Sequence, residues 1–211
     1  MNRFLEIFIA VALLILTAPV QFLTGCAVFV KLGRPVFFIQ QRSGLRGAPI
    51  FVLKFRTMTD ARDGAGDLLP DAQRLTRVTA LIRRLRLDEL PQLWLILGGR
   101  MALVGPRPLL PETLARFGAG GVLRGQVRPG VTGWAQVSGN THLNGGEKLA
   151  LDLWYVCHRD IWLDLRILAE TAKVALRGET RNAVRLAAAR AWLKREAQAA
   201  TPAGPRQEDC A

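Results

Sequence analysis

Asp88 and Glu89 are adjacent carboxylates in a segment, Leu87–Trp94, that the sequence places at the start of a helix. Proline is tolerated in the first helical turn, where backbone N–H groups lack partners, so Pro91 predicts a helix beginning near these two residues. The helix is expected to end at Gly98-Gly99, because glycine is a common helix terminator. A helix N-terminus carries partial positive charge, which keeps carboxylates ionised and also attracts phosphate.

The same pair also has a purely structural explanation, with Asp88 as N-cap and Glu89 as an acidic first-turn residue. A nearby arginine favours chemistry instead. Arg107 stands between two prolines in Gly105-Pro106-Arg107-Pro108, and both prolines stiffen the backbone around it. A planar guanidinium held in one direction is suited to bidentate recognition of phosphate.

Further cations lie on both sides of the carboxylate pair in the sequence. Residues 51–58 predict a strand on which Lys54 and Arg56 project from one face, either as a phosphate clamp or as the positive rim of a solvated edge strand. Arg128 stands in the glycine-rich stretch 127–137, which suits close backbone approach to a ligand but equally suits a turn-rich core.

The first element that must position these residues is an uncharged apolar stretch, residues 7–30. About 20 apolar residues suffice to cross a bilayer core. Pro19, near the middle, removes a backbone hydrogen bond and predicts a kink. With Arg3 before the stretch and Lys31 after it, a re-entrant helix and a single membrane span are both compatible with these residues.

A third interpretation of the N-terminus is a lipoprotein signal. Leu23-Thr24-Gly25-Cys26 resembles a lipoprotein processing site. Against it, the apolar run continues through residues 27–30, where a lipoprotein usually becomes polar.

Amphipathic helices are expected in the rest of the chain. Residues 74–87 combine an apolar stripe with five arginines, which suits a membrane interface or a helix packed on the core with a solvated basic face. A second such helix is predicted at 160–176 and a basic, alanine-rich one at 181–199. Residues 35–39 predict an extended segment, 60–71 an acidic loop and 201–211 a disordered tail.

The charge of the chain points to an anionic partner. Its 29 Lys and Arg against 17 Asp and Glu give a net charge of +12 over 211 residues, which suits nucleic acid or an anionic membrane. The arginines are scattered and no nucleic-acid-binding module is present, so a membrane partner is expected. The cysteines (Cys26, Cys157 and Cys210) form no C-x-x-C pattern, which argues against a disulfide scaffold or a zinc site.

Six short motifs, taken in order, closely resemble the bacterial sugar transferases, the monotopic phosphoglycosyl transferases that start glycoconjugate assembly. The resemblance covers about residues 3–176. The motifs are Gln41-Arg42-Ser43-Gly44, Lys54-Phe55-Arg56-Thr57-Met58, Leu87-Asp88-Glu89-Leu90-Pro91-Gln92, Val104-Gly105-Pro106-Arg107-Pro108, Arg128-Pro129-Gly130-Val131-Thr132-Gly133-Trp134 and Leu151-Asp152-Leu153-Trp154-Tyr155-Val156.

The resemblance implies a covalent mechanism. Asp88 would attack the sugar-linked phosphorus of a nucleotide sugar, usually a UDP-sugar, releasing UMP. Polyprenyl (undecaprenyl) phosphate would then take the phosphosugar from Asp88. Glu89, with Asp88, would hold Mg²⁺. The substrate-binding residues that follow from the motifs are Lys54, Arg56, Arg107, Arg128 and Asp152.

The resemblance also implies a fold and a location. It predicts a helix-rich α+β, monotopic membrane protein on the cytoplasmic face of the bacterial inner membrane. Residues 1–33 would form a kinked re-entrant helix, 34–178 a small catalytic domain with few short strands, and 179–211 a basic helix and tail. The alternative function is a non-enzymatic, basic membrane-anchored scaffold or a lipoprotein. The chain departs from the family pattern at Glu6, Arg86, Arg100 and Ala102.

Overall fold

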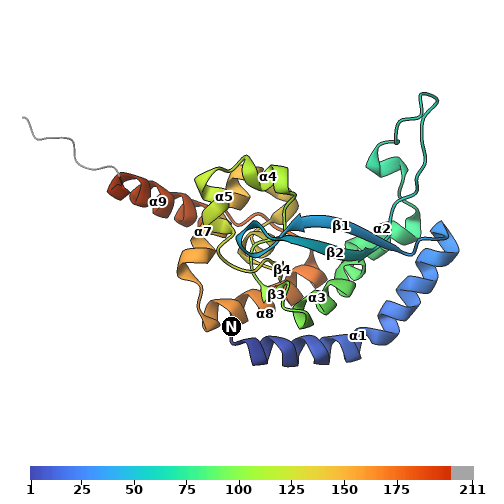
Figure 1. Cartoon of the computed structure of the whole chain (residues 1–211), viewed down its shortest axis with the longest axis horizontal. Coiled ribbons are helices and arrows are strands. Elements are labelled where there is room, and N and C mark those ends of the chain that lie inside the picture. Colours follow the sequence, from blue (N-terminus) through green and yellow to red (C-terminus); the bar gives the residue numbers. More distant parts are fainter. Residues whose placement is uncertain (201–211) are drawn as a thin grey trace, which may run out of the picture.

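The computed structural model describes residues 1–200, with side chains through residue 198, so the predicted disordered tail lies outside the described residues. The helix-rich α+β class is confirmed (Figure 1). The α-helices are α1 (Arg3–Leu32), α2 (Arg77–Arg84), α3 (Leu93–Leu97), α4 (Pro111–Ala115), α5 (Ala119–Arg124), α6 (Trp134–Val137), α7 (Gly145–His158), α8 (Ile161–Arg177) and α9 (Ala183–Ala200). Short 3-10 helices are η1 (Leu45–Gly47), η2 (Asp71–Gln73), η3 (Leu87–Gln92) and η4 (Asn140–His142).

The N-terminal helix α1 is long, apolar and bent. It follows the lower edge of the molecule in Figure 1 and then turns upward toward the end of the hairpin β1–β2. Pro19 lies inside it, and Thr17 and Thr24 return their hydroxyls to the carbonyls of Leu13 and Val20, a contact that also bends helices. Among the described residues, α1 alone is long and apolar enough to cross a membrane, and only 11% of its most apolar window is buried.

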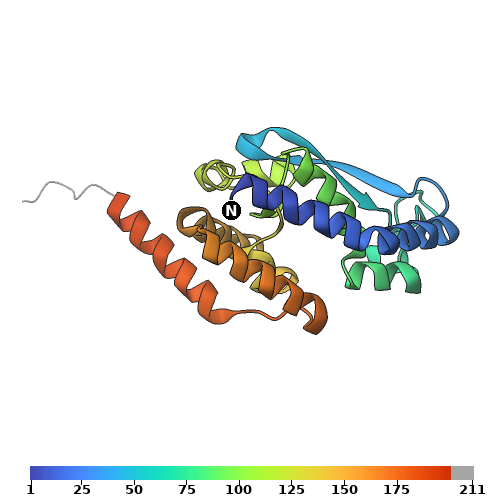
Figure 2. The ribbon, with the colours of Figure 1, turned by 90° about the horizontal axis from the view of Figure 1, so that it is seen from below.

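Both halves of α1 are attached to the rest of the protein, and Figure 2 shows the helix lying across it. Near the start, Arg3 Nη2 donates to the carbonyls of Ile96 and Leu97 at the end of α3. Near the end, Val28 is fully buried and packs with Phe55 and Ile82. The helix is therefore fixed to one body at each end.

Strands β1 (Phe37–Ser43) and β2 (Pro49–Phe55) form an antiparallel hairpin. The register pairs Phe38 with Lys54 and Gln40 with Val52, and paired residues share a face of the sheet. Phe38, Gln40, Val52 and Lys54 therefore lie on one face of the hairpin, and β2 packs against η3. The strand predicted at 51–58 begins two residues earlier and ends at Phe55.

A second, very short sheet joins β3 (Ala102–Val104) and β4 (Gly130–Thr132) in parallel. The two backbones approach so closely that only glycine fits. A Cβ on Gly130 would lie 2.1 Å from Gly105 N, and one on Gly133 would lie 2.1 Å from Gly105 O. The glycine-rich motif after Arg128 thus serves to place the loop that carries Arg107, and Gly130 and Val131 also line the pocket described below.

The helix predicted from Asp88 to Gly98 is corrected by the structure. Residues Leu87–Gln92 form the 3-10 helix η3, and the α-helix α3 begins only at Leu93. Pro91 has no N–H to donate and restricts the preceding residue, so the tighter turn precedes regular α-helix. The helix predicted at 74–87 is likewise shorter, Arg77–Arg84, and starts at a Thr76 capping box.

The C-terminal helices complete the core. Leu151 of α7 and Ile167 of α8 are fully buried, which confirms the helix predicted at 160–176 within one residue. Helix α9 matches the helix predicted at 181–199 within two residues and packs on α7. Buried Glu147 of α7 pairs with Arg181 at 2.5 Å and with Arg190 at 2.9 Å.

Candidate active site

Asp88 and Glu89 lie on η3 with both side chains nearly buried. This short helix is held between β2, α1, α2 and α3. Its N-cap, Arg86, has φ 58° and ψ 21°, a left-handed conformation in which its carbonyl accepts a hydrogen bond from the N–H of Glu89 (3.2 Å). Because Asp88 and Glu89 follow each other in this turn, their side chains point to different surroundings.

Glu89 is surrounded by cations. Its Oε1 lies 2.8 Å from Lys54 Nζ, 2.5 Å from Arg107 Nη2 and 3.7 Å from Arg86 Nη1. Burial alone would raise the pKa of Glu89, but Arg107 and Lys54 outweigh it and lower the pKa to about 2. Glu89 is therefore ionised at any physiological pH, and it holds Lys54 and Arg107 together.

Asp88 has the opposite electrostatic environment. Burial and the charge of Glu89 raise the pKa of Asp88 to about 6, with Lys54 opposing them. Its buried Oδ1 has no hydrogen-bond partner among the described residues. A carboxylate with this pKa is mostly ionised at neutral pH, yet it is poorly solvated and makes no ion pair with any of residues 1–198. These properties suit a nucleophile, because few interactions have to be broken before it attacks.

A pocket opens beside this pair. Two of the predicted residues, Lys54 and Arg107, line it together with Arg42 of β1 and Gln92 of η3. Burial and the neighbouring Arg107 lower the pKa of the Arg42 guanidinium, as expected where cations are crowded. Nε2 of the buried Gln92 has no partner among the described residues. The remaining lining residues are Phe38, Gln40, Val52, Pro108, Gly130 and Val131. The pocket thus offers three cations and a free amide donor to an anion.

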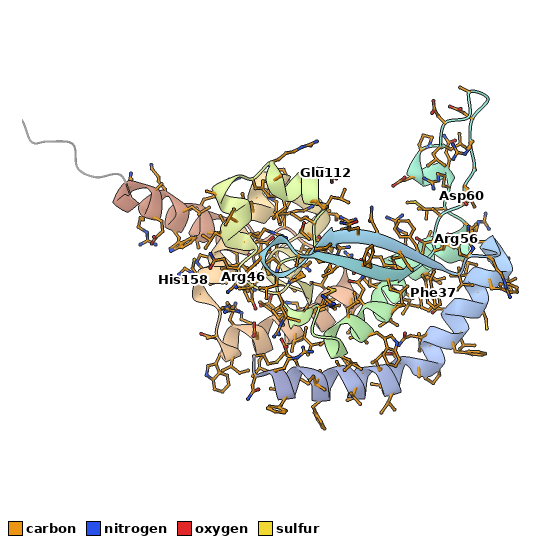
Figure 3. The ribbon with its side chains drawn as sticks, in the orientation of Figure 1. Phe37, Arg46, Arg56, Asp60, Glu112 and His158 are labelled. Carbon is orange, nitrogen blue, oxygen red and sulfur yellow. The ribbon has the colours of Figure 1, made fainter. Side chains whose placement is uncertain are left out.

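Arg56 lies away from this pocket. Because β2 ends at Phe55, the side chain of Arg56 leaves the face of Lys54, and its Nη2 donates to the carbonyls of Leu32 and Gly33. Figure 3 shows Arg56 beside the last turn of α1, near Phe37 and Asp60. In this structure Arg56 caps the C-terminal end of the helix instead of forming a phosphate clamp with Lys54.

Arg128 also lies outside the pocket. Its Nη2 is 3.2 Å from Oε2 of Glu6, a nearly buried residue in the first turn of α1, and Arg3 pairs with the same oxygen. Both arginines thus form ion pairs with Glu6, the carboxylate that α1 buries against the rest of the protein. The structure thus shows Arg128 as a partner of α1, and its predicted contact with substrate stays a prediction.

Asp152 is linked to the pocket residue Arg107 through one residue, Arg124. The carboxylate is buried and accepts a hydrogen bond from Arg124 Nε at 2.8 Å. Arg124 Nη2 in turn donates to the backbone carbonyl of Arg107 at 2.5 Å. Asp152 therefore supports the loop that carries Arg107 and does not itself face the pocket.

The sequence assigned no role to Arg42, Arg86, Gln92 or Arg124. Arg42 and Gln92 belong to matched motifs, and the period-2 spacing of Gln40 and Arg42 would have placed both on one strand face. What the sequence lacks is the hairpin register, which brings that face beside Lys54.

The carboxylate pair is compatible with magnesium. Magnesium is commonly held by one or two carboxylates together with substrate phosphates. Asp88 Oδ1 has no partner among the described residues, whereas Glu89 Oε1 is engaged by cations. Within residues 1–200 no group of three or more His, Cys, Asp or Glu residues could hold a metal. The pair therefore fits the ion only if phosphate oxygens complete the coordination.

Comparison with known proteins gives consistent matches. Residues 1–178 match the family model for bacterial sugar transferases. The uncharacterized sugar transferase EpsL of Bacillus subtilis is 45% identical over 179 residues, which cover 85% of this chain and 89% of that protein. The undecaprenyl-phosphate glucose phosphotransferase of Komagataeibacter xylinus is 39% identical over 82% of this chain, but the match spans only 35% of that longer protein. An Aeromonas hydrophila protein named as an N-acetylgalactosaminephosphotransferase acting on undecaprenyl phosphate is 33% identical over 84% of this chain and 44% of its own length.

Proposed function

The chain belongs to the bacterial sugar transferases, and from this premise we propose that it transfers a sugar phosphate from a nucleotide diphosphate sugar to polyprenyl phosphate. The observation that carries the proposal is the difference between Asp88 and Glu89 in pKa and in ion-pair partners. Asp88 Oδ1 has no partner among the described residues and the pKa of Asp88 is raised to about 6, whereas Glu89 binds the cations of an anion pocket and has a pKa of about 2. One group is poised to react and the other organises the phosphate site.

In the first step, Asp88 attacks the phosphorus that carries the sugar. A bond forms between a carboxylate oxygen and this phosphorus, and the bond to the bridging oxygen of the diphosphate breaks. With a UDP-sugar as donor, UMP leaves with that oxygen. In the second step, an oxygen of polyprenyl phosphate attacks the same phosphorus, which frees the Asp88 carboxylate and yields the lipid diphosphosugar. Splitting the transfer in this way predicts ping-pong kinetics.

The cations of the pocket bind and orient the diphosphate. Lys54 and Arg107 are held 2.8 and 2.5 Å from Glu89 Oε1, so their positions are set before substrate arrives. Arg42 adds a third positive charge, and the amide of Gln92 can donate to a phosphate or sugar oxygen. Glu89 is a poor nucleophile here, because its ion pairs would have to break first.

Magnesium is part of the proposal. Asp88 Oδ1 and Glu89 would hold the ion together with the diphosphate oxygens, and it would neutralise charge on the leaving phosphate. Lys54 and Arg107 engage Oε1 of Glu89, so the ion would be held by the other carboxylate oxygen of Glu89 and by Asp88 Oδ1, which leaves the second oxygen of Asp88 for the attack.

We also propose that α1 enters the membrane and returns to the same face. The helix is bent at its middle, and both ends are attached to the catalytic body through Arg3 and Arg56. Its outer side chains are apolar and exposed, among them Phe8, Leu16 and Phe22. Exposed apolar side chains on neighbouring helices would join it at the interface: Leu81, Leu85, Trp94 and Trp162.

The proposed location is therefore the cytoplasmic face of the bacterial inner membrane, with anionic lipids as partners of the basic chain. Residues 1–33 would form the membrane element and 34–178 the catalytic domain. Processing as a lipoprotein at Cys26 would cut α1 just before Val28, a residue fully buried against Phe55 and Ile82, which disfavours that alternative. A non-enzymatic scaffold leaves unexplained why the buried Oδ1 of Asp88 has no partner in the described part of the chain.

The direct test is release of UMP from UDP-sugars by purified enzyme in detergent or nanodiscs. Magnesium and polyprenyl phosphate are present or omitted in turn. We expect turnover that requires the lipid phosphate, with parallel double-reciprocal lines when both substrates are varied. A protein that binds membranes but releases no UMP from any of a panel of UDP-sugars would be the scaffold, and the proposal would be wrong.

A further inference from the structure

The segment between α8 and α9 contacts the turn that carries the two carboxylates. Glu179 Oε1 accepts a hydrogen bond from Arg86 Nη2. The other terminal nitrogen of the same guanidinium, Nη1, lies 3.7 Å from Glu89 Oε1. Arg86 therefore bridges Glu89 of the active site and Glu179, which lies 93 residues after Arg86 in the chain.

Glu179 is itself fixed in place. It accepts hydrogen bonds from Asn140 Nδ2 at 2.8 Å, from the N–H of Thr141 at 2.9 Å and from the Thr141 hydroxyl. Burial alone would raise the pKa of Glu179, but these hydrogen bonds and the charge of Arg86 lower it to about 2. A permanently charged and anchored carboxylate is a suitable support for a guanidinium.

The backbone of Arg86 explains why its side chain needs such support. Its φ of 58° lies in the left-handed region, which is strained for a residue with a Cβ and suits Gly or Asn better. Its carbonyl begins η3 by accepting from the N–H of Glu89. The two ion pairs of the guanidinium thus offset a strained conformation at the first residue of the turn that positions Asp88.

We propose that Arg86 and Glu179 are positioning residues of the active site: Glu179 holds the Arg86 guanidinium against Glu89, and this contact fixes the turn that presents Asp88 to the reacting phosphorus. The effect on transfer rests on the proposed function, whereas the effect on the turn does not. Arg86 does not line the pocket of Lys54 and Arg107. Substitution should therefore lower kcat and leave KM for the nucleotide sugar nearly unchanged.

Three variants separate side-chain charge from backbone strain. Arg86→Gly relieves the left-handed strain but removes the guanidinium, and we expect kcat to fall roughly tenfold, as small misplacements of reacting groups do. Arg86→Lys keeps the charge and should recover part of the rate. Glu179→Gln should lower kcat, and should have no further effect when combined with Arg86→Gly. Glu170→Gln is the matched control, since Glu170 pairs with Arg185 and joins the same two helices away from η3.

Hydrogen–deuterium exchange of the peptide covering residues 85–92 gives a readout that is independent of turnover. We expect faster exchange in Arg86→Gly and Glu179→Gln, but not in Glu170→Gln. Wild-type kcat and exchange in Arg86→Gly would overturn the proposal, as would a rate loss from Glu179→Gln that persists in the Arg86→Gly background. If the wild type transfers no phosphosugar but both variants still exchange faster than it does, the proposed function is refuted and the positioning of the turn is still supported.

Discussion

Replacing Asp88 by asparagine should abolish turnover and at the same time stabilise the protein at neutral pH. The pKa of Asp88 rises from an ordinary value of 3.8 to about 6 in the folded protein, chiefly through burial. Ionising this carboxyl in the folded state therefore costs about 3 kcal/mol more than in the unfolded chain, at 1.36 kcal/mol per tenfold change. Asparagine keeps the shape of the side chain and removes that cost.

The sign follows from proton linkage. Below about pH 3 Asp88 is protonated in both states, so wild type and variant differ only by a pH-independent offset, which includes the different hydrogen-bonding capacity of the amide at the buried site. Above about pH 7 the carboxyl is ionised in both states, and the folded wild type carries nearly the full cost of the charge. The stability of Asp88→Asn relative to wild type should therefore increase by about 2.5 kcal/mol between pH 4 and pH 7.5, an upper estimate because the site keeps some exposure.

The assay is thermal unfolding of both proteins in the same detergent, followed by tryptophan fluorescence at the two pH values. For a protein of this size, 2.5 kcal/mol corresponds to a change of about 5–10 °C in the Tm difference. Glu89→Gln is the control of opposite sign, because the pKa of Glu89 is lowered to about 2 and its charge stabilises the folded state at neutral pH. A Tm difference between Asp88→Asn and wild type that is equal at both pH values would refute the reasoning.

Other predictions test the supports of the site. Asp152→Asn leaves the buried Arg124 without its ion-pair partner, and we expect a loss of about 3 kcal/mol in unfolding free energy, measured by denaturant titration, together with reduced activity. Gly130→Ala places a Cβ 2.1 Å from the backbone nitrogen of Gly105, which should cost about 1–3 kcal/mol in the same assay, whereas Gly64→Ala, in open space, should not. Pro19→Ala should straighten α1, so that a cysteine placed before Asn2 is labelled from the periplasm in some molecules; labelling in the unsubstituted protein would contradict the re-entrant helix.

The sequence predicted the α+β class, the long apolar helix and the C-terminal helices, because each depends on local periodicity or on proline. It also selected Lys54 and Arg107, which the structure brings to Glu89. It could not separate Lys54 from Arg56, since that requires knowing that β2 ends at Phe55. The prediction applied the alternation of strand side chains to Arg56, one residue beyond the end of β2.

Long-range contacts account for the remaining differences. Arg128 pairs with Glu6, which is 122 residues away in the sequence, and a local sequence pattern cannot predict such a pair. The contrast between Asp88 and Glu89 also depends on distant residues, since neighbours in the chain differ only because Lys54 and Arg107 reach one of them. The 3-10 geometry of η3 was missed because Pro91 is compatible with either helix type at its first turn.

The central claim is that Asp88 is the nucleophile, and trapping the intermediate tests it most directly. Purified protein is incubated with a UDP-sugar radiolabelled in the sugar, without polyprenyl phosphate, and quenched in acid. We predict label on the wild-type protein, mapped to the peptide that contains Asp88, and no label on Asp88→Asn. Label on Glu89, or turnover by Asp88→Asn at a rate near that of the wild type, would contradict the account.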